Sequence, residues 1–546
     1  MSRYKEIQSK SKPVSIATTN TNVTSYDHQQ VSSTPPPIDT KQSSTDVKES
    51  LRPKSKIQAY SRQQSAHYAI TKKDIKLLTK KEDELKHQKQ EVETDENHNF
   101  KEIEFLNQLY LKTNSTTISK ELNNKIPNIT SNTNLNWSIH IFLSTIMVKF
   151  INSWYLTKLN TNEFEFIEKL YNEVIIVFAK DLNSRICKIF ENEDKILTFV
   201  DNLIHILNEH LNEFVDKDLR KYPNKVINDY YYESKSCNSL AYEPNLKPSE
   251  ILNQYLAQKH IIFDPSNEET QLSYFRIMVK KILQTTFKDP NNIIFNSKIS
   301  SDLVILIISD LILNKLFERL SSEEFFIGNF DKVISNLLLT IKSKKKVKEE
   351  KLSMLSKLNR IINSTALGIS YLTKYRDHSF DFLKSSIFNL LNNLFFIDVY
   401  KPMIYGLFYS TNSLILMFAG LHNLMNTLIL NFIFYQIKKL QFEEKLSGLI
   451  DDLRVQLFYE NKTELKQEEQ TEMLRLKELS DKVKELLQSI PIVTKLYSNE
   501  EHLTNTFNSI LIIFTKDEEI DPRNKMNKYL VIKLLDYIVH SLYTEI

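Results

Sequence analysis

Glycine and cysteine are scarce in this sequence. Its 546 residues include five glycines and two cysteines, and no glycine precedes Gly328. Phosphate-cradling loops need closely spaced glycines, so the sequence offers no nucleotide site of that kind. The N-terminus also lacks the apolar run of a signal peptide. With only Cys187 and Cys237 present, these features indicate a reducing, cytosol-facing protein.

Catalytic and metal-binding motifs are missing as well. The sequence has no Gly-x-Ser-x-Gly, Cys-x-x-Cys, P-loop or EF-hand pattern. His205 and His210 are five residues apart, whereas the zinc-protease motif needs a spacing of four and a Glu after the first His. We therefore expect no catalytic residue, no metal site and no cofactor, and predict that the protein is not an enzyme.

Neither sign of charge dominates. There are 71 basic and 68 acidic residues, so nucleic-acid binding would need a local basic patch. The one dense run, KSKKKVKEEK at 342–351, has no aromatic residues between its lysines for base stacking, and nucleic acid is not an expected partner. Two interpretations of Lys344, Lys345 and Lys346 stay open: a solvated helical connector, or a contact with an anionic membrane.

A long stretch without charge stands out. Residues 402–437 contain no Asp, Glu, Lys or Arg. A helix over 411–436 would be about 39 Å long, more than the roughly 30 Å of a bilayer core, so a membrane span is one interpretation. However, Asn412, Asn423, Asn426 and Asn431 recur along one side of such a helix, and each carboxamide would need a partner in lipid. We therefore favour a helix or helix pair that buries its wide apolar face inside a helical domain.

Helical periodicity dominates the rest of the chain. Apolar residues recur at i, i+3, i+4 and i+7, and strand-like alternation is nearly absent, which predicts an all-α protein. Residues 303–313 are apolar on almost every side around Asp310, as is typical of a central helix of a bundle. Helices are predicted within 141–159, 164–178, 186–215, 248–258, 268–286, 299–319, 446–457, 463–488, 500–514 and 524–543.

Composition divides the chain into segments. Residues 1–95 form a polar and charged tail that is too poor in apolar residues to fold, and 96–136 hold a short helix and a linker. Two helical blocks, 137–325 and 381–546, follow, and a helical connector with the basic run, 326–380, joins them.

Both blocks resemble known domains. The first, with INSWY at 151–155 and YEPNL at 242–246, resembles the PX-associated (PXA) domain of the sorting nexins. The second is similar to the sorting-nexin C-terminal (nexin C) domain through LFFIDVYKPMIYGLFY at 394–409, LIDDLRVQLFYENK at 449–462, IPIVTKLYS at 490–498 and NKYLVIKLLDYIVHSLY at 527–543.

The chain also departs from the larger sorting nexins. The short gap between the blocks has no room for a PX or an RGS domain, and Glu243-Pro244 stands where the PXA domain usually has His-Pro. The compact arrangement looks like that of short fungal members of the family, which are associated with contacts between the endoplasmic reticulum and the vacuole.

The resemblance implies a function. The two end domains would pack into one helical unit around a long apolar cavity that carries lipid. Our leading hypothesis is a lipid-binding and lipid-transfer protein at organelle membranes or membrane contact sites. The alternative is a tether or trafficking scaffold with a filled core. Candidate cavity-lining or core residues are Trp154, Leu306, Phe395, Phe408, Leu416, Phe418 and Leu428.

The same resemblance sets expectations for ligands and location. We expect a bound phospholipid or fatty acid, peripheral association with membrane lipids, and a larger sorting-nexin-family protein as a partner. The expected location is the cytoplasmic side of endoplasmic reticulum, vacuole or endosome membranes.

Overall fold

The computed structural model consists of helices. It describes residues 100–152, 155, 164–218, 221–222, 224–236, 246–265, 269–287, 297–348, 378–439, 442–459, 468–489, 500–517 and 519–546. The chain divides into two compact units, 1–76 and 77–546, and all described residues belong to the second. These residues form no strand, so the all-α prediction is confirmed. The predicted tail, 1–95, lies outside the described residues.

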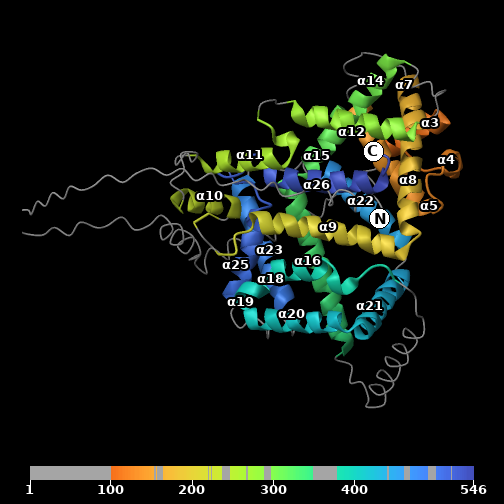
Figure 1. The fold of residues 1–546 in the computed structure, drawn as a ribbon. Coiled ribbons are helices and arrows are strands. Elements are labelled where there is room, and N and C mark those ends of the chain that lie inside the picture. Colours follow the sequence, from red (N-terminus) through yellow and green to blue (C-terminus); the bar gives the residue numbers. More distant parts are fainter. Residues whose placement is uncertain are drawn as a thin grey trace, which may run out of the picture. The chain divides into compact units, whose positions relative to one another are not determined.

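The first helices follow the predicted order (Figure 1). They are α3 (Phe100–Leu111), α4 (Lys120–Lys125), α5 (Thr133–Ile146), η3 (Met147–Asn152), α7 (Glu165–Lys169), η4 (Leu170–Ile175), α8 (Ile176–Phe190), α9 (Glu193–Phe214), α10 (Lys225–Ser236), α11 (Pro248–Lys259), η5 (Ile261–Phe263), α12 (Thr270–Thr286), α14 (Lys298–Leu306), η6 (Ile307–Leu313), α15 (Asn314–Leu320) and α16 (Glu323–Lys348).

The remaining helices belong to the second predicted block. They are η7 (Phe382–Lys384), α18 (Ile387–Phe395), α19 (Ile397–Tyr400), α20 (Pro402–Met417), α21 (Ala419–Lys439), α22 (Phe442–Phe458), α23 (Glu468–Ser489), α25 (Glu500–Ile512) and α26 (Lys525–Leu542).

Helix starts are set by short polar side chains. Asn132 accepts hydrogen bonds from the backbone N–H groups of Asn134 and Leu135 and so caps α5. Asn192 caps α9 in the same way. These side chains satisfy amides that have no partner within the helix. At α11, Pro248 occupies the first turn, where its missing N–H costs nothing.

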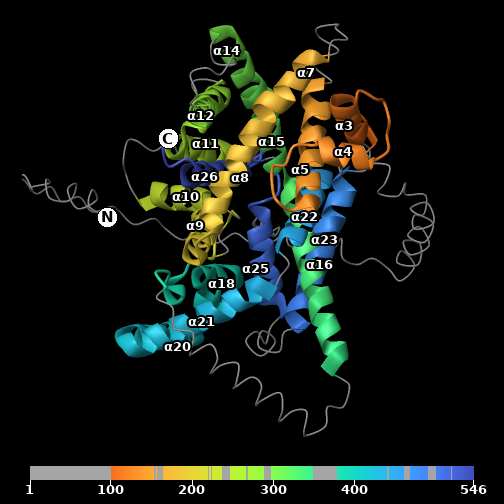
Figure 2. The ribbon, with the colours of Figure 1, turned by 90° about the vertical axis from the view of Figure 1, so that its right-hand side faces the viewer.

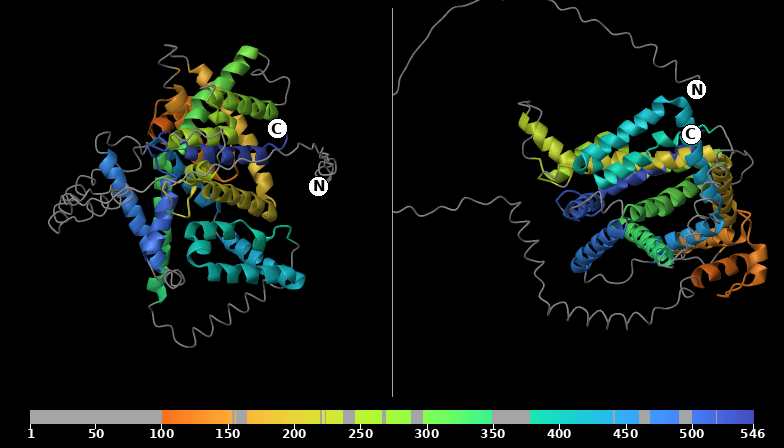
Figure 3. Two further views of the ribbon diagram at one scale, coloured as in Figure 1. Left: turned by 60° about the vertical axis from the view of Figure 1, so that its left-hand side comes forward. Right: turned by 90° about the horizontal axis from the view of Figure 1, so that it is seen from below.

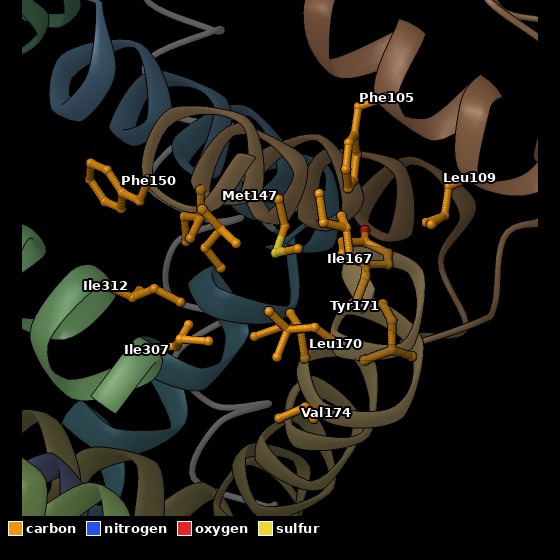
Figure 4. Close-up of a cluster of buried hydrophobic side chains, with 14 of the residues drawn as sticks. Phe105, Leu109, Met147, Phe150, Ile167, Leu170, Tyr171, Val174, Ile307 and Ile312 are labelled. Carbon is orange, nitrogen blue, oxygen red and sulfur yellow. The ribbon is translucent and has the colours of Figure 1, made fainter. Parts of the chain in front are cut away.

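A first apolar core gathers helices from both predicted blocks (Figure 4). It includes Leu106 of α3, Met147 of η3, Tyr171 of η4, Ile307 of η6 and Phe458 of α22. Three π-helical segments, η3, η4 and η6, all contribute side chains to it. The helix predicted to be central, 303–313, therefore lies partly in this core.

The packed chain begins before Trp137, where the sequence analysis placed its start. Leu106 and Leu109 of α3 are buried in the first core. Asn107 is fully buried, and its amide donates to the carbonyls of Ser115 (2.7 Å) and Thr117 (3.0 Å). Such bonds explain how an apolar-poor Asn/Thr/Ser segment folds, because buried polar side chains satisfy the backbone groups of the loop.

The two predicted blocks are not separate bodies. Helix α22 packs on α5, α16 on α23, α18 on α9, and α26 on α9 (Figure 2). Arg319 of α15 donates to the carbonyl of Leu457 in α22, and its guanidinium lies 5.3 Å from the Phe458 ring centroid. This confirms the expectation that the two blocks pack together.

Candidate membrane-contact surface

The charge-free stretch folds as two helices joined at one residue. The chain bends by 109° between helices α20 and α21, with Phe418 at the break. The Phe418 N–H donates to the Ile415 carbonyl (3.3 Å), and its own carbonyl accepts from the His422 N–H (2.9 Å). Phe418 thus ends one helix and begins the next, and the continuous helix considered over 411–436 does not form.

The length and composition of the helices decide whether any could span a membrane. Among the described residues, no single helix is long and apolar enough to cross a bilayer. Taken together, the bent pair Pro402–Met417 and Ala419–Tyr435 is long and apolar enough to do so by length and composition alone.

Most of the pair's apolar side chains face outward. Helix α20 contains no buried residue, and the exposed fractions reach 88% for Met403, 69% for Leu407 and 76% for Met417. The prediction that this stretch buries its wide apolar face was therefore wrong for α20. Among the described side chains of α21, the buried ones are Asn426, Leu430 and Phe434. We call residues 402–435, the bent helix pair, the hairpin. Its large exposed apolar residues are Met403, Ile404, Leu407, Phe408, Tyr409, Leu414, Met417, Phe418, Leu421, Leu424, Phe432 and Tyr435.

The polar side of the hairpin faces a short segment, 378–386, which we call the strap. Asn412 donates to the Leu383 carbonyl (3.2 Å). Asn426 accepts from the Phe382 N–H and donates to the Phe380 carbonyl, both at 2.9 Å. Two of the four asparagines noted in the sequence thus form hydrogen bonds with the nine-residue strap. The strap also reaches one apolar residue of α21, because the His378 ring stacks on the buried Phe434 ring (centroids 5.5 Å apart), whereas no residue of α20 is buried.

The strap is in turn fixed to α9. The Ser379 N–H and hydroxyl donate to Asp194 (2.6 and 2.9 Å), and the Ser386 N–H donates to Asp201 (2.7 Å). Burial disfavours the charged form of Asp194, but hydrogen bonds from Ser379 and His378 outweigh it and lower the pKa of this carboxyl. These bonds connect the hairpin, through the strap, to α9.

An aromatic contact supports the other side of α20. The Phe388 ring of α18 lies 5.6 Å from both the Phe382 ring of the strap and the Phe408 ring of the hairpin. Helix α18 packs on α9 (Figure 3). Phe388 therefore links the hairpin to a packed helix.

The predicted lipid-lining residues fall into separate places. Phe408, Leu416, Phe418 and Leu428 all lie on the hairpin; Phe408 and Phe418 are exposed, and the other two are half-buried. Phe395 is half-buried at the end of α18, where it packs against a small buried cluster that includes Leu338 of α16 and Leu479 of α23. Leu306 is exposed on α14. Trp154 lies outside the described residues. A cavity-lining role for these residues stays a prediction.

The predicted basic contact lies at the end of a helix. Lys344, Lys345 and Lys346 belong to the last turns of α16, and their side chains are outside the described part of the structure. Glu243-Pro244 also lies outside it.

The sequence analysis missed the most exposed residues of the surface. Met403, Leu407 and Met417 were not chosen, because a charge-free stretch was expected to be buried. The sequence did contain a clue to this exposure. Its four asparagines lie on one narrow side of the helix and can bond to one neighbouring segment, which leaves the other faces without polar contacts.

A partly open pocket of about 610 Å³ between α9, α10 and α11 has a mixed lining in which polar surface exceeds apolar surface. Its lining includes Glu209, Glu213, Lys225 and Tyr255. The carboxylates have internal partners: Lys533 lies 2.7 Å from Glu209, and Lys259 lies 3.4 Å from Glu213. Such a lining does not suit an acyl chain. Among the described residues, no cluster of three His, Cys, Asp or Glu side chains is placed to hold a metal ion.

Comparison with known proteins identifies one domain. The chain matches the PXA domain at residues 132–333, against the predicted first block of 137–325. The PXA part of the resemblance is therefore confirmed, and it suggests a membrane-trafficking protein of the sorting-nexin type. The nexin C part and the fungal form stay predictions. No curated protein and no solved structure matches the chain.

Proposed function

From a PXA domain at 132–333, we propose that this protein is a non-enzymatic lipid-binding and lipid-transfer protein that docks on organelle membranes through the α20–α21 hairpin. The observation that carries the proposal is a hairpin without acidic or basic residues on which twelve large apolar side chains are exposed. Large exposed apolar patches on folded proteins mark interaction surfaces.

The hairpin suits a bilayer energetically. Transfer of one half-exposed large apolar side chain from water to lipid gains roughly 1 kcal/mol. A dozen such residues with no charged residue among them supply enough free energy for stable adsorption. The 109° bend favours a shallow wedge over a straight span.

Lipid carriage is the second part of the proposal. An acyl chain of about sixteen carbons gains on the order of 12 kcal/mol when it is enclosed by protein rather than water. A membrane offers the same gain, so exchange between the two is close to isoenergetic. We propose that Phe408, Leu416, Phe418 and Leu428 contact a phospholipid or fatty acid at the membrane surface.

The PXA match supports a proposed setting for this function. The protein works on the cytoplasmic face of endoplasmic reticulum, vacuole or endosome membranes, where a larger sorting-nexin-family protein is a partner. No catalytic residue or cofactor is part of this function.

Vesicle flotation tests the docking step. In the full chain, Met403, Leu407 and Met417 are changed together to Ser; all three are strongly exposed, so the fold is retained. A matched control changes Ile261, Val333 and Leu449, which are exposed elsewhere, to Ser. At roughly 1 kcal/mol per side chain, binding to neutral vesicles falls more than tenfold in the hairpin variant only. Equal binding by both variants would overturn the docking role.

Lipid content tests carriage against the alternative. The tether or scaffold hypothesis is favoured by two large buried clusters, the first core and a second one that includes Phe214, Phe275 and Phe514, and by the mainly polar pocket between α9, α10 and α11. Mass spectrometry of organic extracts from the purified full chain distinguishes the two. Near-stoichiometric lipid of restricted class supports carriage. Trace lipid, equal to that of an unrelated helical protein from the same cells, supports the scaffold.

A further inference from the structure

A second exposed apolar surface lies on α12 and α14. Its apolar members are Ile277 of α12 (59% exposed) and Ile299, Leu303 and Leu306 of α14 (81%, 39% and 41%). Ile299, Leu303 and Leu306 are spaced i, i+4 and i+7, so they share one helix face. Helices α12 and α14 pack against each other, and we call these residues with their neighbouring lysines the α12–α14 surface.

Lysines border this surface. Lys280 and Lys281 follow Ile277 by three and four residues, and Lys298 adjoins Ile299. All three side chains are exposed and form no ion pair within the described part of the chain. The acidic residue on the same face is Asp302, whereas Asp310 nearby is paired with Arg276 (2.5 Å). The surface therefore has an excess of positive charge.

The two apolar surfaces differ in chemistry. The hairpin has no charged residue, so its attraction to lipid is independent of headgroup charge. The α12–α14 surface has four exposed apolar side chains and three lysines, the combination that binds anionic lipid surfaces peripherally. Charge complementarity thus selects an anionic membrane as its occupant.

The two surfaces are also far apart within the packed unit. Helix α12 packs on α8, α8 on α9, and α9 on α18, which precedes the hairpin. Figures 1 and 2, related by a rotation about the vertical axis, both place α14 at the top and α20 at the bottom. One flat bilayer cannot lie against both ends.

We propose that the α12–α14 surface docks on an anionic membrane while the hairpin holds a second membrane, so that one molecule bridges two bilayers. The proposal rests on the proposed docking role of the hairpin. It adds a second binding site and the class of lipid that this site binds. The hairpin would insert into a membrane regardless of headgroup charge, and the α12–α14 surface would adsorb to an anionic membrane in a salt-sensitive way.

A vesicle-capture assay tests it. The full-length protein is first bound to neutral phosphatidylcholine vesicles on beads, and fluorescent vesicles that contain phosphatidylserine are then added. The variant Lys280→Glu, Lys281→Glu, Lys298→Glu is compared with Lys120→Glu, Lys188→Glu, Lys195→Glu, which reverses three exposed lysines on other helices. Because each lysine near an anionic surface contributes severalfold to binding, capture falls at least about tenfold in the first variant and stays unchanged in the second.

Salt and lipid composition give independent readouts. Raising the ionic strength from 0.15 to 1 M shortens the Debye length from about 8 to about 3 Å, so capture of anionic vesicles falls while attachment to the neutral vesicles persists. Replacing phosphatidylserine by phosphatidylcholine in the second vesicle also abolishes capture. Capture that is equal in both lysine variants, or insensitive to salt, overturns the proposal.

The assay separates this proposal from the docking role of the hairpin. If the protein fails to attach to neutral vesicles, the hairpin role fails, and the α12–α14 surface is tested directly by flotation with phosphatidylserine vesicles. There the variant Lys280→Glu, Lys281→Glu, Lys298→Glu must bind more weakly than its control. Equal flotation overturns the second site regardless of the first.

Discussion

The Nε2 atom of His422 in the hairpin lies 3.0 Å from Oδ1 of Asp381 in the strap. Asp381 also lies 3.1 Å from Lys384. Burial disfavours the charged carboxylate, but the hydrogen bonds from His422 and Lys384 outweigh this effect and lower the pKa of Asp381. The pair therefore adds a charge-assisted bond to the amide contacts of Asn412 and Asn426.

Removing that bond should loosen the strap. We expect His422→Leu to raise the exchange rate of the Phe382 amide, which donates to Asn426, by about fivefold, since one such bond contributes about 1 kcal/mol. Hydrogen exchange followed by mass spectrometry measures it. As a control, Leu424→Ala changes an exposed residue two positions along the same helix and should leave the exchange unaffected. An unchanged Phe382 amide in His422→Leu would show that the asparagines alone hold the strap.

The contact between the two predicted blocks should be costly to weaken. Phe458 of α22 is 6% exposed, and its ring centroid lies 5.6 Å from Phe150 and 5.9 Å from Phe142. Phe458→Ala should lower the free energy of unfolding by about 3–5 kcal/mol, as for other buried aromatic residues.

The matched control lies on the same helix. Leu449 is 61% exposed, so Leu449→Ala should change the free energy of unfolding by less than about 0.5 kcal/mol. Urea denaturation measures both variants. A loss below about 1 kcal/mol in Phe458→Ala would argue that α22 does not contribute to the first core.

His210 should make the protein sensitive to acid. Its ring is fully buried near Phe214 and Phe514, and neither nitrogen has a hydrogen-bond partner among the described residues. Burial, with a smaller effect from Lys533, lowers its pKa from 6.5 to about 3. His210 therefore binds a proton at a higher pH in the unfolded chain than in the folded one. The free energy of unfolding falls as the pH drops from about 6.5 towards 3.

The variant His210→Leu should remove this proton linkage. We expect the free energy of unfolding at pH 7 to change by about 1 kcal/mol or less, because no hydrogen bond is lost. The slope of stability against pH between 6.5 and 4.5 should decrease by up to about 1.4 kcal/mol per pH unit. The variant His205→Leu, at an exposed position of the same helix, is the control. Identical slopes in all three proteins would refute the linkage.

The basic run at the end of α16 gives a further prediction. Changing Lys344, Lys345 and Lys346 to Glu should weaken flotation with anionic vesicles about tenfold if this run docks on membranes. Comparison with the triple Glu variant of Lys280, Lys281 and Lys298 shows which lysines bind lipid. Unchanged flotation of the α16 variant would leave the run as a solvated connector.

The spacing of apolar residues predicted the helices well, because amphipathic periodicity and helix caps depend on residues that are close in sequence. The predicted range 248–258 corresponds to α11 (Pro248–Lys259), and 524–543 corresponds to α26 (Lys525–Leu542). The polar stripe of the hairpin was also visible, and Asn412 and Asn426 are bonded as the cost of a buried carboxamide requires.

What the pattern could not show is which partner covers each face. The apolar faces of α20 were expected inside a core, but no residue of α20 is buried, and its hydrogen bond to the strap is made by Asn412. Conversely, the polar linker before Trp137 folds because single side chains, such as Asn107, satisfy the loop backbone. Both outcomes depend on tertiary contacts that no window of sequence contains.

The packing of α22 on α5 has a consequence for synthesis of the chain. Helix α5 ends at Ile146, whereas α22 begins at Phe442, so about three hundred residues are translated between them. At about 5–20 residues per second, the apolar face of α5 waits roughly 15–60 s for the helix that covers it. During that interval the nascent chain exposes surface of the kind that chaperones bind. A ribosome that stalls after α16 would therefore release an aggregation-prone fragment and not a free-standing domain.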